Sequence, residues 1–221
     1  MGAAPMATAT VATLLARARV MPTIALERAD DALPLAETLQ DAGIALMEIT
    51  LRTPAGMPAI RALAARRDLR IGIAAGTLRT ADELRAAHDA GAVLLVSPGH
   101  TASLLDLAGR LQLPWLPGCA TPSEVTLLLE HGWRVQKLFP ALPGLLDALA
   151  GPFADVQFVP TGGVTADNAP ALLAQPGVIA VSGTWIAPRA LIAARDWAAI
   201  ATRASAAARV VERLASEGLA G

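Results

Sequence analysis

The chain has 221 residues, a net charge of -1 and a pI near 6.3, and it has no run of like charges. These properties exclude the basic surface that nucleic-acid binding requires. Much of the 54% hydrophobic content is alanine, and charged residues, proline or glycine interrupt every apolar stretch before it reaches the roughly 18 residues of a membrane span. The single cysteine, Cys119, is typical of a reducing compartment. We therefore expect a cytoplasmic protein that binds neither nucleic acid nor membranes.

The sequence also lacks the patterns of a secretory signal peptide and of a metal site. Met1 to Thr10 is small and apolar without a basic n-region, and the segment from Val11 to Leu15 is too short for the apolar part of a secretory signal. The three histidines, His88, His100 and His131, have no partners at metal-ligand spacing. We expect no signal peptide and no metal, with the histidines at the surface or at helix ends.

Short apolar segments alternate with helical segments along the whole chain, after a short amphipathic helix over Thr10 to Val20. The predicted strands are Met21 to Leu26, Ile44 to Leu51, Leu69 to Ala75, Ala92 to Ser97, Pro114 to Pro117, Arg134 to Leu138, Val156 to Pro160 and Val178 to Ser182. The predicted helices that follow them in turn are Asp31 to Ala42, Pro54 to Arg66, Ala81 to Ala90, Ala102 to Leu111, Ser123 to His131, Leu145 to Leu149, Asn168 to Leu173 and the last helices from Pro188 onward.

This alternation favours one architecture. No two predicted strands are joined by a turn of hairpin length, and parallel strands need crossovers of the kind that the helices provide. The G-x-G-x-x-G fingerprint of an open doubly wound sheet is missing after the first strand. We expect a single domain over residues 1-221, an α/β (β/α)8 TIM barrel with a short N-terminal helix. Its active site would lie where the strands end.

Lys137 is the only lysine among 18 basic residues, and the others are arginines. Arginine stays protonated, whereas a lysine in an apolar pocket can lose its proton and attack a carbonyl. Alternation along the strand places Val135, Lys137 and Phe139 on one face, so the lysine comes late in its strand beside an aromatic ring. The alternative explanation is that a single lysine occurs here by chance in an arginine-rich composition.

The strand from Ile44 to Leu51 has one polar face, formed by Glu48, Thr50 and Arg52, and one apolar face. If the apolar face packs against the helices of a barrel, the polar face points toward the barrel axis, with Arg52 nearest the mouth. A solvated polar face is the alternative, but a closed barrel leaves neither face of a strand in water.

Thr77 follows the third predicted strand. Ile71, Ile73, Ala75 and Thr77 share one face by alternation, which predicts that Thr77 ends the strand with its hydroxyl at the mouth. The small residues before it leave space beside that hydroxyl.

Two glycine clusters follow the last two predicted strands, where barrels often bind phosphate. They are Pro160-Thr161-Gly162-Gly163-Val164 and Ser182-Gly183-Thr184-Trp185. Glycines let backbone N–H groups approach an anion, and hydroxyls add donors, so no cation is needed. Turns that require a positive φ are the alternative use of either cluster. Their occurrence at both strands favours a phosphate or sulfate site.

Seven motifs occur in order along the chain. They are Glu48-Ile49-Thr50-Leu51-Arg52-Thr53-Pro54, Ala75-Gly76-Thr77, Ser97-Pro98-Gly99, Pro117-Gly118, Thr121-Pro122-Ser123-Glu124, Lys137-Leu138-Phe139-Pro140-Ala141 and Pro160-Thr161-Gly162-Gly163. With them the chain closely resembles the KDPG/KHG aldolase family over roughly residues 12 to 200. These are bacterial class I aldolases that cleave 2-dehydro-3-deoxy-6-phosphogluconate to pyruvate and glyceraldehyde 3-phosphate.

The resemblance implies a role for each candidate residue. Lys137 would form a Schiff base with the C2 keto group, and Glu48 would act as general acid and base. Arg52 and Thr77 would hold the pyruvate end, with Arg52 also near Glu48, and Thr161 would contact the hydroxyl-bearing end of the substrate. The other substrate-binding positions are Pro98 and Phe139, and the phosphate-binding positions are Gly162, Gly163, Gly183 and Thr184. The resemblance further implies a homotrimer with neither a metal nor an organic cofactor.

Three positions differ from the usual family pattern. Lys-Leu-Phe-Pro-Ala is commonly followed by an acidic residue and paired glycines, whereas this chain has Leu142-Pro143-Gly144, so we expect altered phosphate affinity or loop closure. Ser182 stands where a glycine is usual, and we expect its bulk to lie close to the bound anion. Ala74 also replaces a glycine, which is a minor change.

Two alternatives to a gluconate aldolase remain open. One is an aldolase for 2-dehydro-3-deoxy-6-phosphogalactonate or for the unphosphorylated 4-hydroxy-2-oxoglutarate, although Thr161 favours the gluconate epimer. The other is a non-catalytic barrel that binds a phosphometabolite, to which the altered loops point. A binding protein has no reason to keep a lone lysine opposite a buried glutamate, which favours the enzyme.

Overall fold

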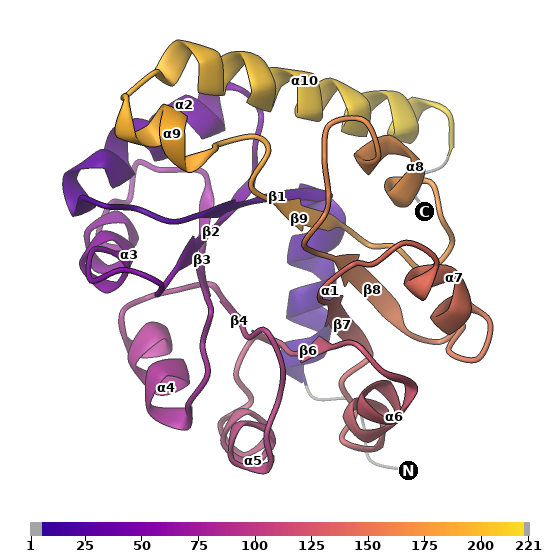
Figure 1. Cartoon of the computed structure of the whole chain (residues 1–221). Coiled ribbons are helices and arrows are strands. Elements are labelled where there is room, and N and C mark those ends of the chain that lie inside the picture. The colour runs from indigo at the N-terminus through magenta and orange to yellow at the C-terminus, as the bar shows by residue number, and fades with distance from the viewer. Residues whose placement is uncertain (1–5, 219–221) are drawn as a thin grey trace.

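The structure, a computed structural model, describes residues 6–218 and consists of parallel strands joined by helices (Figure 1). The strands are β1 (Val20–Ile24), β2 (Leu46–Thr50), β3 (Gly72–Gly76), β4 (Leu94–Val96), β5 (Trp115–Leu116), β6 (Gly118–Cys119), β7 (Val135–Leu138), β8 (Gln157–Pro160) and β9 (Val181–Gly183). The helices are α1 (Met6–Ala18), α2 (Ala32–Asp41), α3 (Gly56–Ala64), α4 (Ala81–Asp89), α5 (Ala102–Leu111), α6 (Pro122–Glu130), α7 (Leu145–Ala150), α8 (Ala169–Leu173), α9 (Arg189–Ala193) and α10 (Trp197–Ser216), with a 3-10 turn η1 (Ala29–Asp31) before α2.

The predicted order of strands and helices is confirmed, and most boundaries differ by one to three residues. The predicted strand from Pro114 to Pro117 is confirmed as β5, which ends at Leu116. A further short strand that was not predicted, β6, begins at Gly118 on the other side of Pro117. Proline has no backbone N–H to donate to a ladder, which explains the interruption.

Arg19 explains two further differences between the predicted and the observed boundaries, at the end of α1 and at the start of β9. Its φ of 57° ends α1 at Ala18, before the predicted end at Val20. Its buried guanidinium donates to the carbonyls of Val178 and Ile179, at 3.1 and 2.9 Å. Those two residues were predicted to begin the last strand, but β9 begins only at Val181. Burial also lowers the pKa of Arg19 from its ordinary value.

The strands form two parallel sheets. One has six strands in the order β5-β4-β3-β2-β1-β9, and the other has three in the order β6-β7-β8. Isolated bridges join Phe158 to Val178 and Thr161 to Ser182, so β8 also lies beside the chain that leads into β9. Figure 1 shows the strands around the centre, with most of the helices outside them. The predicted parallel α/β class is confirmed.

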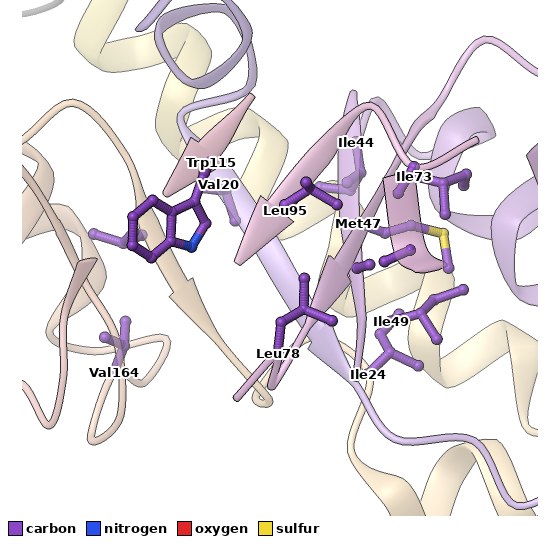
Figure 2. Packing of buried hydrophobic residues seen from close by; sticks show 14 of the residues in the cluster. Val20, Ile24, Ile44, Met47, Ile49, Ile73, Leu78, Leu95, Trp115 and Val164 are labelled. Carbon is purple, nitrogen blue, oxygen red and sulfur yellow. The ribbon is translucent and has the colours of Figure 1, made fainter. Parts of the chain in front are cut away.

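The buried apolar residues form two layers. In the inner layer α1 packs against the strands, and its members are Val11, Leu15, Ala18, Met21, Leu46, Ala74, Leu94, Val96, Leu116, Val135, Val159, Ile179 and Ala180. The outer layer lies between the strands and the surrounding helices, and Met47, Ile49, Ile73, Leu95 and Trp115 belong to it (Figure 2). Each strand therefore has an inner and an outer face, as alternation requires.

The apolar segment from Val11 to Leu15 is thus part of a core helix, while Met1 to Pro5 lies outside the described residues. Within residues 6–218, no helix is both long enough and apolar enough to span a membrane.

Candidate active site

β2 directs Glu48 into the interior. Leu46 belongs to the inner layer and Met47 and Ile49 to the outer one, so alternation turns Glu48 inward, where it is 0% exposed. The predicted inward orientation is confirmed for Glu48. An ionised carboxylate in such a position requires partners, because burial without them is costly.

Lys137 supplies one of these partners. It comes from β7, whose Val135 also faces the inner layer, and it is 4% exposed. Its Nζ lies 3.3 Å from Glu48 Oε1, which joins residues 89 positions apart. The ring of Phe139 lies 5.6 Å from the same Nζ. Removing two charges from water costs about as much free energy as their attraction returns, so a buried ion pair contributes little to the stability of the fold. The pair of Lys137 and Glu48 is therefore a candidate for a catalytic role.

Gly76 makes room for the glutamate. β3 runs parallel to β2 with Ala74 opposite Glu48, and a Cβ on Gly76 would lie 2.0 Å from Glu48 Oε1. No real side chain tolerates that distance. The space that the sequence predicts beside Thr77 is therefore occupied by the carboxylate of Glu48.

The second carboxylate oxygen faces two hydroxyls that sequence analysis missed. Glu48 Oε2 lies 3.3 Å from Thr23 Oγ1 and 3.4 Å from Ser182 Oγ, and the two hydroxyl oxygens are 2.8 Å apart. Ser182 was expected to lie close to the bound anion, and in the structure its hydroxyl faces Thr23 and Glu48. Its side chain is fully buried and turned inward, because β9 pairs with β1 and places Ser182 opposite Met21.

A hydrogen bond joins Arg52 to Thr77, in which Arg52 Nε donates to Thr77 Oγ1 at 3.2 Å. Thr77 does not share the face of Ile73 and Ala75 as predicted, since those two residues lie in the outer layer. Its φ of 63° breaks the alternation. A positive φ is a strained conformation for a β-branched residue, and such strain is concentrated at functional sites.

Arg52 itself is exposed, and no direct contact joins it to Glu48 among the hydrogen bonds and ion pairs of residues 6–218. The cation that pairs with Glu48 is Lys137. The predicted proximity of Arg52 to Glu48 therefore does not extend to an ion pair.

Pro98 is held near the lysine by backbone packing. A Cβ on Gly118 would lie 2.3 Å from the carbonyl carbon of Pro98, and Gly118 stands opposite Lys137 in the register of β6 and β7. His100 Nδ1 lies 2.8 Å from the Gly118 carbonyl oxygen. Only a glycine allows the loop after β4 to approach the lysine-bearing strand this closely.

The loops after β7 and β8 enclose a cavity of about 450 Å³. Gly162 and Gly163 line it with φ values of 81° and 77°, and Leu142-Pro143-Gly144 lines the opposite side. Gly162 also packs against Phe139, since a Cβ there would lie 3.2 Å from the ring. Thr161 is buried, and its hydroxyl donates to the Val159 carbonyl.

Gly183, which is buried, and Thr184 do not line that cavity. A Cβ on Gly183 would lie 3.4 Å from Val164 Cβ and 2.7 Å from the Trp185 ring, so the β9 loop packs against the β8 loop. Thr184 is exposed. The loops that carry the two glycine clusters are therefore in contact.

The histidines lie where they were predicted. His88 is in the last turn of α4, His131 follows α6, and His100 is in a loop. Among the residues that the structure describes, no group of three or more His, Cys, Asp or Glu side chains is arranged to hold a metal ion.

A family model described as KDPG and KHG aldolase matches residues 11–203. The 2-dehydro-3-deoxy-phosphogluconate aldolase of Pseudomonas aeruginosa is 44% identical over 217 residues, which cover 96% of this chain and 93% of that protein. The enzyme of the same name from Haemophilus influenzae is 39% identical over 183 residues, covering 81% of this chain and 86% of that one.

Two solved structures are similar over nearly their whole length. KDPG aldolase from Legionella pneumophila, with pyruvate captured as a covalent carbinolamine intermediate, has a TM-score of 0.85 and 36% identity, over 89% of this chain and 97% of that chain. The 2-keto-3-deoxy-6-phosphogluconate aldolase of Zymomonas mobilis with 3-phosphoglycerate has a TM-score of 0.84 and 35% identity, over 90% of this chain and 94% of that chain.

Proposed function

Because this chain belongs to the KDPG and KHG aldolase family, we propose that it cleaves 2-dehydro-3-deoxy-6-phosphogluconate to pyruvate and D-glyceraldehyde 3-phosphate through a Schiff base on Lys137. The observation that carries this proposal is the buried pair of Lys137 Nζ and Glu48 Oε1 at 3.3 Å. The reaction needs one amine nucleophile and one group that moves protons in both directions, and this pair supplies one of each.

Imine formation uses both residues. Transfer of one ammonium proton from Lys137 to Glu48 leaves a neutral amine, which attacks the C2 carbonyl and forms a carbinolamine. Glu48 then protonates the C2 hydroxyl, which leaves as water and yields a protonated imine. The carbinolamine captured in the Legionella pneumophila aldolase supports this order of events.

Bond cleavage uses the imine as an electron sink. Glu48, now a carboxylate, takes the proton of the C4 hydroxyl. The C3–C4 electron pair becomes the C2–C3 double bond, and the π electrons of the imine move to its nitrogen. The aldehyde leaves and an enamine remains. Glu48 returns its proton to C3, and water hydrolyses the resulting imine to pyruvate and free Lys137.

The remaining candidate residues bind the substrate. Arg52 holds the carboxylate of the pyruvate end, because a guanidinium matches that group geometrically, and Thr77 orients Arg52 through their hydrogen bond. Pro98 and Phe139 bound the space beside Lys137, and Thr161 contacts the hydroxyl-bearing end. The phosphate-binding residues are Gly162, Gly163, Gly183 and Thr184, whose backbone and hydroxyl donors suit an anion without a cation.

We extend the proposal to the architecture. The two sheets act as one (β/α)8 barrel within a single domain over residues 1-221, and the bridges at Phe158 and Thr161 support this closure. A homotrimer without a cofactor and a cytoplasmic location complete the proposal, the location because the only cysteine is free and buried.

Turnover on three substrates tests the assignment. The purified chain is assayed with 2-dehydro-3-deoxy-6-phosphogluconate, its galactonate epimer and 4-hydroxy-2-oxoglutarate, and pyruvate release is followed in each case. We expect the highest kcat/KM for the phosphorylated gluconate substrate. Equal values for all three would refute the narrow assignment and leave a general 2-keto acid aldolase.

A further inference from the structure

The buried hydroxyls of Thr23 and Ser182 form a short chain that leads from Glu48 to the backbone of β1. Glu48 Oε2 lies 3.3 Å from Thr23 Oγ1, which lies 2.8 Å from Ser182 Oγ, which in turn lies 2.8 Å from the Met21 carbonyl oxygen. Thr23 is 5% exposed and Ser182 0%. Bulk water therefore does not replace these contacts.

The number of hydroxyl protons limits the hydrogen bonds that Thr23 and Ser182 can form. Each hydroxyl has one proton to donate, whereas an ionised carboxylate and a carbonyl only accept. The 2.8 Å contact between the hydroxyls of Thr23 and Ser182 uses one proton, so one remains for an end of the chain. It goes either to Glu48 Oε2 or to the Met21 carbonyl.

The charge on Glu48 decides between these two arrangements. An ionised carboxylate attracts the free proton, because hydrogen bonds to a charged acceptor are about twice as strong as neutral ones. Either Ser182 donates to Thr23 and Thr23 donates to Glu48 Oε2 at 3.3 Å, or Thr23 donates to Ser182 and Ser182 donates to the same oxygen at 3.4 Å. When Glu48 is neutral, both hydroxyls can rotate, so that Thr23 donates to Ser182 and Ser182 donates to Met21. Neither arrangement leaves a hydroxyl proton without an acceptor.

We propose that Thr23 and Ser182 are positioning residues that anchor Oε2 of Glu48, so that Oε1, on the side of Lys137, exchanges protons with the substrate. This inference rests on the proposed function of Lys137 and Glu48. A general acid and base must alternate between charged and neutral forms, and a hydroxyl pair that adjusts to both forms keeps the carboxyl group oriented through the cycle. Lys137 on β7 is the charged group that faces Glu48 from the other side.

Two sequence features fit this role. Ser182 replaces the glycine that is usual in the family, and it brings a hydroxyl to a position where a glycine offers none. Thr23 lies opposite Glu48 in the register of β1 and β2, so the two hydroxyls approach the same oxygen from neighbouring strands.

The test compares Thr23→Val and Ser182→Ala with wild type. Two rates are measured: turnover, and exchange of the pyruvate methyl protons with deuterium from the solvent, which reports proton transfer at C3 directly. Removing one hydrogen bond to a charged group should slow exchange and kcat about tenfold to hundredfold. We expect KM to change less than about threefold, because neither hydroxyl binds substrate in this account. Borohydride trapping of pyruvate at equilibrium should persist in both variants.

Matched variants separate positioning from general damage. Thr23→Ser keeps the hydroxyl and should restore exchange to near the wild-type rate. Thr50→Val removes a buried hydroxyl of β2 that donates to the Ile24 carbonyl at 2.9 Å instead of to Glu48, and it should leave exchange unchanged. Because the paired hydroxyls act as one unit, the double variant Thr23→Val with Ser182→Ala should be little slower than the slower single variant.

Wild-type exchange rates in folded Thr23→Val and Ser182→Ala that still trap pyruvate would overturn the inference. An equal loss in Thr50→Val would overturn it too, since the effect would then belong to any buried hydroxyl. Ser182→Gly, the residue usual in the family, is the second variant if Ser182→Ala does not fold. Failure of the wild-type chain to trap pyruvate would instead refute the proposed function, so the two failures are distinct.

Discussion

Gly76 and Glu48 share one small space at the junction of β2 and β3, where a Cβ on Gly76 would lie 2.0 Å from Glu48 Oε1. The Glu48 carboxylate therefore occupies the space that a Cβ at position 76 of β3 would fill. The same oxygen lies 3.3 Å from Lys137 Nζ, so the glycine also sets the geometry of the ion pair.

Gly76→Ala is expected to displace Glu48 and inactivate the enzyme. Misplacement of a reacting group by about 1 Å can lower turnover about 100-fold, and overpacking at this site should also reduce the free energy of unfolding by about 1–3 kcal/mol. Steady-state kinetics and thermal unfolding measure the two effects. Wild-type turnover in this variant would show that Glu48 is not held as described.

Gly109→Ala serves as the matched glycine variant. Gly109 lies inside α5, and a Cβ there has no heavy atom within 4 Å. Replacing a helical glycine with alanine lowers the entropy of the unfolded chain, so the free energy of unfolding should rise by about 0.5–1 kcal/mol with turnover unchanged. A fall in Tm would contradict this expectation.

Glu48→Gln should slow catalysis while the chain remains folded. The amide keeps the shape of the carboxyl group but does not exchange protons at this step, and general acid and base catalysis contributes about 10²–10⁴-fold. We expect kcat to fall by a factor in this range with a small change in KM. An unchanged kcat would assign the proton transfers to another group or to a bound water.

Cys119 should resist alkylation in the folded protein. Burial, followed by the nearby charge of Glu124, raises the pKa of its thiol from 9.0 to about 12. Only the thiolate reacts, so iodoacetamide at pH 8 should label the chain after unfolding and leave the native form unlabelled. Rapid labelling of the native form would show that the thiol is accessible.

The same shift predicts how stability depends on pH. As pH rises above about 9, the thiol of the unfolded chain loses its proton while the folded thiol keeps it, so the free energy of unfolding decreases toward pH 12. Below pH 9 the contribution is fully present. Cys119→Ser should reduce this alkaline loss. The chain has no tyrosine and a single lysine, so few other groups titrate in this range. If the free energy of unfolding of Cys119→Ser decreased with pH above 9 as steeply as that of the wild type, the raised pKa of Cys119 would be contradicted.

Alternation along the strands predicted the inward direction of Glu48 and placed Lys137 on one face with Val135 and Phe139. The roles of Glu48 and Lys137 as a pair came from the family resemblance. The two-residue period of a strand holds whatever the neighbouring strands are. The same rule failed at Thr77, because its positive φ lies outside strand geometry and no composition pattern announces such strain in a β-branched residue.

Thr23 and Ser182 could not be found from the sequence. Their hydroxyls meet only because β1 lies between β2 and β9 in a particular register, which depends on the packing of the whole sheet. The sequence showed a serine at position 182 in place of the usual glycine, but it did not show that the hydroxyl of Ser182 points toward Glu48. The division of β5 from β6 could have been predicted, since Pro117 lies between them.

The most direct test of the account is reduction with borohydride in the presence of pyruvate, followed by intact-mass and peptide analysis. Lys137 is the only lysine, so a side-chain amine adduct has one possible site, and the N-terminal peptide controls for the other amine. We predict one reduced pyruvyl group on the Lys137 peptide and none in Lys137→Arg, which keeps the charge but has no nucleophilic amine. A folded wild-type chain without an adduct would contradict the Schiff-base mechanism and favour a barrel that only binds its ligand.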